Sequence, residues 1–239
     1  MKMTIALLFL GASCFAQSEP RLWAKEPDSF HGVKFGATEA EVRSNLNPWA
    51  CAPSTEGEAC YFDMDLGGRQ FNWVALFSKG ALSEIVCVFD RQEFSRVGGI
   101  LVSAYGDPST NAENGGLRWN GDRVTAAIDA AIPTERKGII HQISAARYKL
   151  ELDTALETHQ RILAVGLDLL RKTHDRRDSD RIADEASRQY DQDAAKAKER
   201  REKFMAGTYG SFSISLNSYA AEARTRAEEQ EKADASKIR

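Results

Sequence analysis

The spacing of apolar residues divides the chain into two halves with different predicted structures. From about Ser29 to Tyr148, apolar residues alternate with polar ones or form short runs between glycines, which predicts strands and short helices. From about Lys149 to Arg239, they recur every three or four residues in a segment without proline, which predicts helices. We therefore expect an α+β fold: an antiparallel sheet with two short helices, followed by a long charged C-terminal helical extension.

The strands are predicted from alternation and from short apolar runs. Residues 60–66 alternate, whereas residues 71–77 and 85–89 are apolar at almost every position, so these two strands should be covered on both faces. The pair Asn120-Gly121 predicts a hairpin with a type I′ turn. The alternation of Ile139, His141 and Ile143 predicts one more strand.

Helices are predicted where the apolar spacing changes to three and four. Residues 38–41 fit a capping box that opens a short helix, and residues 94–105 form a second amphipathic helix ended by Gly106. The broad apolar face over 152–170 is expected to cover the second face of the sheet. The narrower stripe over 174–203 predicts a solvated helix or a weak coiled coil, and Ser211–Lys237 is predicted as a terminal charged helix.

The N-terminus has the pattern of a secretory signal peptide. Lys2 precedes a short apolar run that ends in small residues and Ala16, with polar Gln17 next. The run is shorter than the roughly 20 apolar residues that span a bilayer. Cleavage after Ala16 predicts a periplasmic or secreted chain. Acylation of Cys14 would instead make an outer-membrane lipoprotein, but Gly11 stands where that motif favours an aliphatic residue.

These patterns predict five segments along the chain: a signal peptide over 1–16, a linker over 17–28, a disulfide-stapled domain over 29–148, a long helix or helices over 149–206, and a Gly-broken linker with the terminal charged helix over 207–239.

The formal net charge is only −3 on 239 residues, with 28% charged residues. So small a net charge argues against a partner that binds the whole chain electrostatically. Together with export, it excludes nucleic acid as an expected partner. We also expect no transmembrane span.

Processing after Ala16 leaves three cysteines. In an oxidising compartment we expect a Cys51–Cys60 disulfide and a buried, inert Cys87 thiol, with a Cys60–Cys87 bridge as the rival arrangement. A metal site is not expected, because no further cysteine or suitably spaced histidine completes four ligands.

Few other residues suggest chemistry. Asp63 and Asp65 share the polar face of one strand and either bind a cation or a sugar or are simply solvated. His141 is expected to be a hydrogen-bonded core histidine that could face a ligand. The basic segments 171–177 and 196–201 form helix-surface ion pairs or meet anionic lipid. Phosphate-binding glycine loops, zinc-protease motifs and nucleophile elbows are absent from the sequence, so no catalytic residue and no cofactor is predicted.

The run from Phe30 to Val42 resembles the opening of small exported bacterial α/β domains of unknown function, in which a strand and a glycine lead into a capped helix, a cysteine pair and a three-strand meander. The segment 94–119 resembles the second helix and hairpin of the same domains. Gly36, Thr38 and Val42 also resemble a short turn of the SmpA/OmlA-type outer-membrane assembly lipoproteins. The resemblance implies a fold and an envelope location, but no activity.

The sequence therefore predicts an exported, non-catalytic protein that binds an unidentified protein or envelope ligand, with residues 149–239 as a possible contact region. One alternative is an envelope-tethered scaffold that uses its charged C-terminal helices. Another is an envelope hydrolase whose site is assembled from dispersed residues.

Overall fold

We analysed a computed structural model of the chain. The structure describes residues 23–54, 57–111, 115–173 and 176–220, together with 225, 229, 232 and 233. The predicted signal peptide, its cleavage site and Cys14 lie outside the described residues. The fold class predicted from the sequence is confirmed, because antiparallel strands and separate helices make an α+β architecture.

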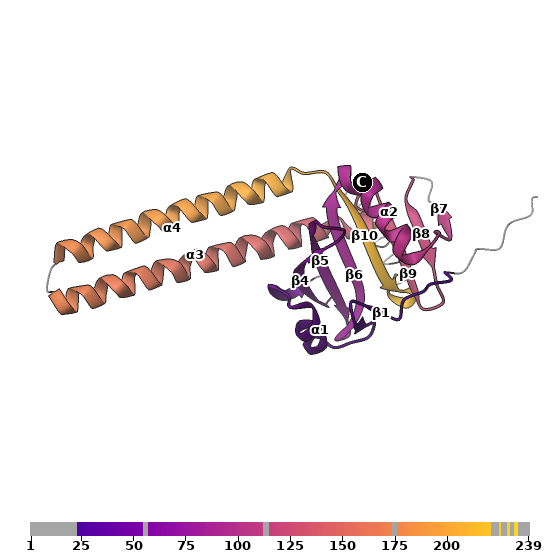
Figure 1. Cartoon of the computed structure of the whole chain (residues 1–239), viewed down its shortest axis with the longest axis horizontal. Coiled ribbons are helices and arrows are strands. Elements are labelled where there is room, and N and C mark those ends of the chain that lie inside the picture. Colours follow the sequence, from indigo (N-terminus) through magenta and orange to yellow (C-terminus); the bar gives the residue numbers. More distant parts are fainter. Residues whose placement is uncertain are drawn as a thin grey trace, which may run out of the picture.

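The centre of the fold is an eight-stranded sheet (Figure 1). Every neighbouring pair of strands in it is antiparallel. Across the sheet the order is β3-β4-β5-β6-β10-β9-β8-β7, so the last strand in the described part of the chain lies in the middle. The strands are β3 (Ala50–Ser54), β4 (Gly57–Asp65), β5 (Gln70–Ser78), β6 (Ala81–Asp90), β7 (Thr110–Asn111), β8 (Leu117–Asn120), β9 (Val124–Asp129) and β10 (Tyr209–Leu216). A separate two-stranded sheet pairs β1 (Ser29–Phe30) with β2 (Val33–Lys34).

One face of the sheet carries the larger core. Helices α1 (Glu39–Leu46) and α2 (Phe94–Tyr105) pack on this face with the N-terminal segment, over aromatic side chains that include Trp73, Trp119 and Phe212. The predicted capping box is present, since Thr38 and Glu41 bond reciprocally at the start of α1. Gly106, at φ 82°, ends α2 as predicted.

The opposite face is covered by the beginning of α3 (Gly138–Thr173), which follows the short 3-10 turn η2 (Thr134–Arg136). Ile139 and Ile143 are buried against Tyr61 and Val86 of the sheet. The predicted strand over residues 139–143 is wrong. Ile139 and Ile143 are one helical turn apart, so a two-residue alternation and a four-residue helical repeat look alike over so short a segment.

Beyond its first turns, α3 leaves the sheet and forms a long hairpin with α4 (Arg176–Met205) (Figure 1). The 36 residues of α3 span about 54 Å at 1.5 Å per residue. Small residues are buried between the helices eleven positions apart, at Ala155 and Gly166 of α3 and at Ala186 and Ala197 of α4. The expectation that residues 152–170 cover the sheet is therefore wrong, because the buried part of this segment packs on α4 and the rest of its apolar face, which includes Leu156 and Leu167, is exposed.

Strand β10 returns the chain from the hairpin to the centre of the sheet, between β6 and β9. The helix predicted over Ser211–Lys237 is thus wrong for residues 211–216, whereas residues 217–220 are helical. The alternation of Phe212 and Ile214 with Ser211 and Ser213 was the sequence signal for a strand. All four residues are buried, so the serine face of this strand is not a solvent-exposed face.

The folded domain begins earlier than predicted, since residues 23–28 are not a free linker. The Trp23 indole is 5% exposed and donates to the carbonyl of Tyr105. The Glu26 carboxylate accepts hydrogen bonds from the backbone N–H groups of Asp122 and Arg123, in the loop between β8 and β9, and of Val124, the first residue of β9. This contact ties the N-terminal segment to a hairpin about a hundred residues away.

The same contact explains why the β8–β9 turn is not of type I′. A hairpin forms there as predicted, but neither Asn120 nor Gly121 has the positive φ that a type I′ turn requires. Gly121 serves a different purpose, because a Cβ atom on it would collide with the Glu26 carboxylate. A glycine is needed here because it leaves space for the Glu26 carboxylate, not because the backbone is left-handed.

Candidate functional site

The predicted disulfide is present between Cys51 and Cys60, which lie directly opposite each other on β3 and β4 with their Cα atoms 4.0 Å apart. Closing a loop of this length is worth roughly 2–3 kcal/mol in the chain-entropy description. The rival bridge is not formed: Cys87 is a free, buried thiol, and burial raises its pKa well above the ordinary value. The bond therefore staples an edge of the sheet.

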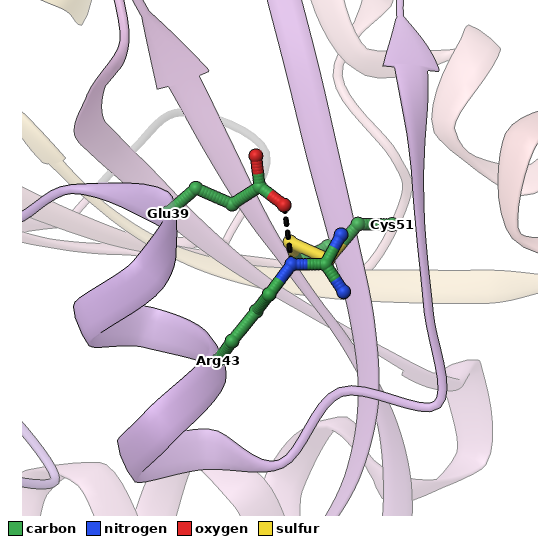
Figure 2. Close-up of a disulfide and its surroundings, with 4 residues drawn as sticks. Glu39, Arg43 and Cys51 are labelled. Atoms are coloured by element: carbon green, nitrogen blue, oxygen red, sulfur yellow. Dashed lines mark hydrogen bonds and ion pairs between the residues drawn. A yellow bond between two sulfur atoms is a disulfide. The ribbon is translucent and has the colours of Figure 1, made fainter.

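Charged side chains surround the disulfide. Glu39 and Arg43, one turn apart on α1, form an ion pair beside Cys51 (Figure 2). A hydrogen bond between the carboxyl groups of Glu39 and Glu58 lowers the pKa of Glu39, with help from Arg43, and raises the pKa of Glu58. Glu58 is thus the carboxyl that retains the proton to higher pH.

One carboxylate oxygen of Glu39 and the two sulfur atoms lie within 4.8 Å of one another, a spacing that a metal ion could bridge. In the disulfide, however, neither sulfur is a thiolate, and the thiolate is the form of cysteine that binds metals. Arg43 also places a positive charge next to Glu39 (Figure 2). The oxidised site therefore does not suit a cation, and we assign it a structural role.

A cleft of about 620 Å³ lies where the helical hairpin joins the sheet. Its walls come from the ends of β4 and β5, the first turns of α3, the last turns of α4 and the start of β10. The side chains fall into aromatic and charged groups: Phe71, Tyr148, Phe204 and Tyr209; Arg147, Arg200, Arg201 and Lys203; and Asp63, Asp90 and Glu151. The cleft thus combines apolar rings with an excess of cationic groups.

Two of the cations are already neutralised. Arg147 donates to both carboxylate oxygens of Asp63, at 2.6 and 2.8 Å, and to the amide oxygen of Asn72, while its guanidinium lies over the ring of Trp49. Arg200 of α4 pairs with Glu151 of α3 at 2.9 Å. The Arg147–Asp63 pair links α3 to the sheet, whereas the Arg200–Glu151 pair links the two helices of the hairpin to each other.

The other two cations are not paired. Arg201 lies over the ring of Tyr148, with its guanidinium carbon 5.0 Å from the ring centre. Neither Arg201 nor Lys203 has an ion-pair partner within the part of the chain that the structure describes. Both side chains are exposed. They leave positive charge at the cleft that an anionic group can neutralise.

Two polar atoms in the wall also lack partners. Ser144 is 4% exposed, and neither its hydroxyl nor Nε of Arg147 has a hydrogen-bond partner among the described residues. Buried polar groups are normally hydrogen-bonded, so the cleft wall contains two polar atoms whose hydrogen-bonding capacity is unused among the described residues. No histidine lines the described part of the cleft, and the Ser144 hydroxyl makes no hydrogen bond to a described residue.

Of the three residues predicted as ligand-facing, Asp63, Asp65 and His141, only Asp63 reaches the cleft. Asp65 instead accepts the backbone N–H of Gly68 in the turn that follows β4. His141 is exposed on α3 rather than buried in a strand, so the expectation of a core histidine is wrong. Cys14 lies outside the described residues.

Sequence reasoning missed Arg147, Tyr148 and Lys203 as cleft residues. The basic segment 196–201 was noted, and its ion-pair interpretation is confirmed at Lys196 and Arg200. Arg201 differs from its neighbours because it faces a ring of α3, and only the folded hairpin shows that.

Comparison with family models, with curated proteins and with solved structures finds no match for this chain. None of the helices in the described ranges is long and apolar enough to cross a bilayer.

Proposed function

We propose that this is an exported, periplasmic and non-catalytic binding protein whose cleft, at the base of the helical hairpin, receives an anionic group of a protein or envelope ligand. The observation that carries the proposal is the pair Arg201 and Lys203, which line an aromatic cleft without ion-pair partners among the described residues. The carboxylate or phosphate of a partly apolar ligand pairs with Arg201 and Lys203, and the apolar part of the ligand packs on the aromatic side chains of the cleft.

The export part of the proposal rests on the N-terminal pattern that ends at Ala16. A disulfide, which persists mainly in oxidising compartments, fits that location. So does the resemblance of residues 30–42 to small exported bacterial domains of unknown function.

Charge reversal at the cleft tests this function. The intact mature chain is immobilised and exposed to an envelope extract, alongside the double variant Arg201→Glu/Lys203→Glu. Lys196→Glu/Lys198→Glu is the matched control, because these lysines carry the same charge change on α4 outside the cleft lining. We expect the cleft variant to lose at least about tenfold in captured ligand and the control to retain it. Equal capture by both variants would refute a role for the cleft.

A second candidate function is an envelope-associated scaffold built through the hairpin. The observation in its favour is that α3 exposes large apolar side chains, among them Leu156 and Leu167, away from the sheet.

A further inference from the structure

The hairpin carries a leucine stripe on an exposed side of α3. Leu156 is 44% exposed and Leu167 is 57% exposed, and the half-buried Leu163 lies between them on the same side of the helix. Exposed leucines one or two turns apart form a continuous strip, unlike the single apolar residues that are common on protein surfaces.

The stripe continues with polar residues at the spacing of a helix–helix contact. Its members are Asp153, Leu156, Gln160, Leu163, Leu167 and Arg171. They are separated by three or four residues throughout, which is the spacing of the apolar seam in a two-helix contact. The four central positions hold three leucines and Gln160, and the two ends carry opposite charges.

Those end charges form no ion pair among the described residues. Much of the hairpin surface is covered by ion pairs between neighbouring turns, such as Glu157 with Arg161 and Asp168 with Lys172. Asp153 and Arg171 make no such pair with any described residue, although both are exposed. An acid at one end and a base at the other make the stripe complementary to a second copy of itself in antiparallel orientation.

We propose that this stripe binds a second copy of the chain, with the two α3 helices antiparallel about a two-fold axis between residues 161 and 162. In that register Leu156 of each copy lies opposite Leu167 of the other, and Asp153 lies within one residue of Arg171, an axial offset of about 1.5 Å. The two-fold axis repeats both contacts. The helix end at Thr173 comes opposite residue 150, where α3 leaves the sheet, so the two sheets lie at opposite ends and do not collide.

Because each copy contributes only three leucines, the dimer is weak and depends on concentration. The contact uses the outer side of α3 and none of the cleft residues Arg201 and Lys203. It is therefore independent of ligand binding at the cleft, and either proposal can fail while the other stands.

Charge swapping gives a direct test by sedimentation equilibrium of the mature chain across a concentration series. Asp153→Arg and Arg171→Asp should each weaken dimerisation about tenfold, because each places like charges opposite one another twice. The double variant Asp153→Arg/Arg171→Asp should recover the wild-type dissociation constant to within about threefold, since it restores both pairs in reverse.

Two further variants control for folding and for position. Leu156→Glu/Leu167→Glu should be monomeric with an unchanged circular dichroism spectrum. Val165→Glu changes a residue that is 63% exposed outside the stripe, and it should dimerise like the wild type. A wild-type chain that stays monomeric up to about 0.1 mM, or a double charge swap that fails to recover dimerisation, would overturn the proposal.

Discussion

At the scale of single residues, Glu26 shows how one side chain fixes a boundary of the fold. Partial burial raises the pKa of its carboxyl, but the three backbone N–H donors of Val124, Arg123 and Asp122 outweigh this effect, and the pKa lies below its ordinary value. The folded state therefore favours the ionised carboxylate. The N-terminal segment is held to the sheet by this charge and by the indole of Trp23.

Glu26→Gln should lower the free energy of unfolding by about 1 kcal/mol at neutral pH, because the amide accepts these hydrogen bonds less strongly than a carboxylate does. A lowered folded pKa adds stability above the unfolded pKa, and this stability is lost as the pH falls through the folded pKa. The difference between wild type and variant should thus shrink below about pH 4, near the ordinary glutamate pKa.

Urea unfolding at a series of pH values measures this difference. Glu157→Gln, on the exposed surface of α3, is the control and should change stability little at any pH. A Glu26→Gln penalty that stays constant between neutral and acidic pH would contradict an ionised anchor.

Residue-scale prediction from the sequence succeeded where the determinants are local. The capping box at Thr38 and the Cys51–Cys60 bond involve residues close in sequence. The role of Gly121 was misjudged because its cause, the Glu26 carboxylate, comes from a distant segment. In the sequence, Arg201 and Lys203 are indistinguishable from other helix-surface cations, because their place in the cleft depends on the packing of α3 and the sheet next to α4.

At the scale of elements, the hairpin of α3 and α4 is an insertion between two strands rather than a C-terminal extension. Strands β9 and β10 are neighbours in the sheet, and the whole hairpin lies between them in sequence. The sequence pattern concealed this because half of the residues of β10 are serine or glycine. The alternation of Phe212 and Ile214 indicates a strand, but it does not indicate that the strand lies at the centre of the sheet.

This topology predicts opposite results for two deletions. A chain ending at residue 206 lacks β10, which pairs with both β6 and β9 and contributes the buried Phe212 and Ile214, so it should show no cooperative unfolding transition. Removing 156–166 and 183–193 takes eleven residues from each helix. Because the buried positions recur every eleven residues, the remaining Ala155 and Ala197 still lie in the contact between the shortened helices. The shortened chain should fold.

Thermal unfolding monitored by near-ultraviolet circular dichroism distinguishes these outcomes. The shortened hairpin should melt within about 5 °C of the wild type, since the sheet core is untouched. A cooperative transition in the chain ending at residue 206 would show that β10 is dispensable. Loss of the transition in the shortened chain would show that the outer hairpin supports the sheet.

At the scale of the whole molecule, the cleft and the leucine stripe lie at different places along the hairpin. The sheet and the hairpin base form the cleft, and α3 carries the leucine stripe. Figure 1 shows that the hairpin projects away from the sheet. The proposed ligand site and the proposed self-association site thus lie on different parts of the hairpin. Two chains joined through α3 would present their clefts at opposite ends of the assembly.

Export is the central claim, because the oxidised cysteine pair, the periplasmic location and an envelope ligand all depend on it. Intact mass of the chain recovered from a bacterial host, with and without reduction, measures it most directly. We predict a chain that begins at Gln17, gains two hydrogen atoms on reduction, and has one free thiol, Cys87, that becomes reactive only after unfolding. A cytosolic chain that retains Met1, or one that begins at an acylated Cys14, would contradict the account.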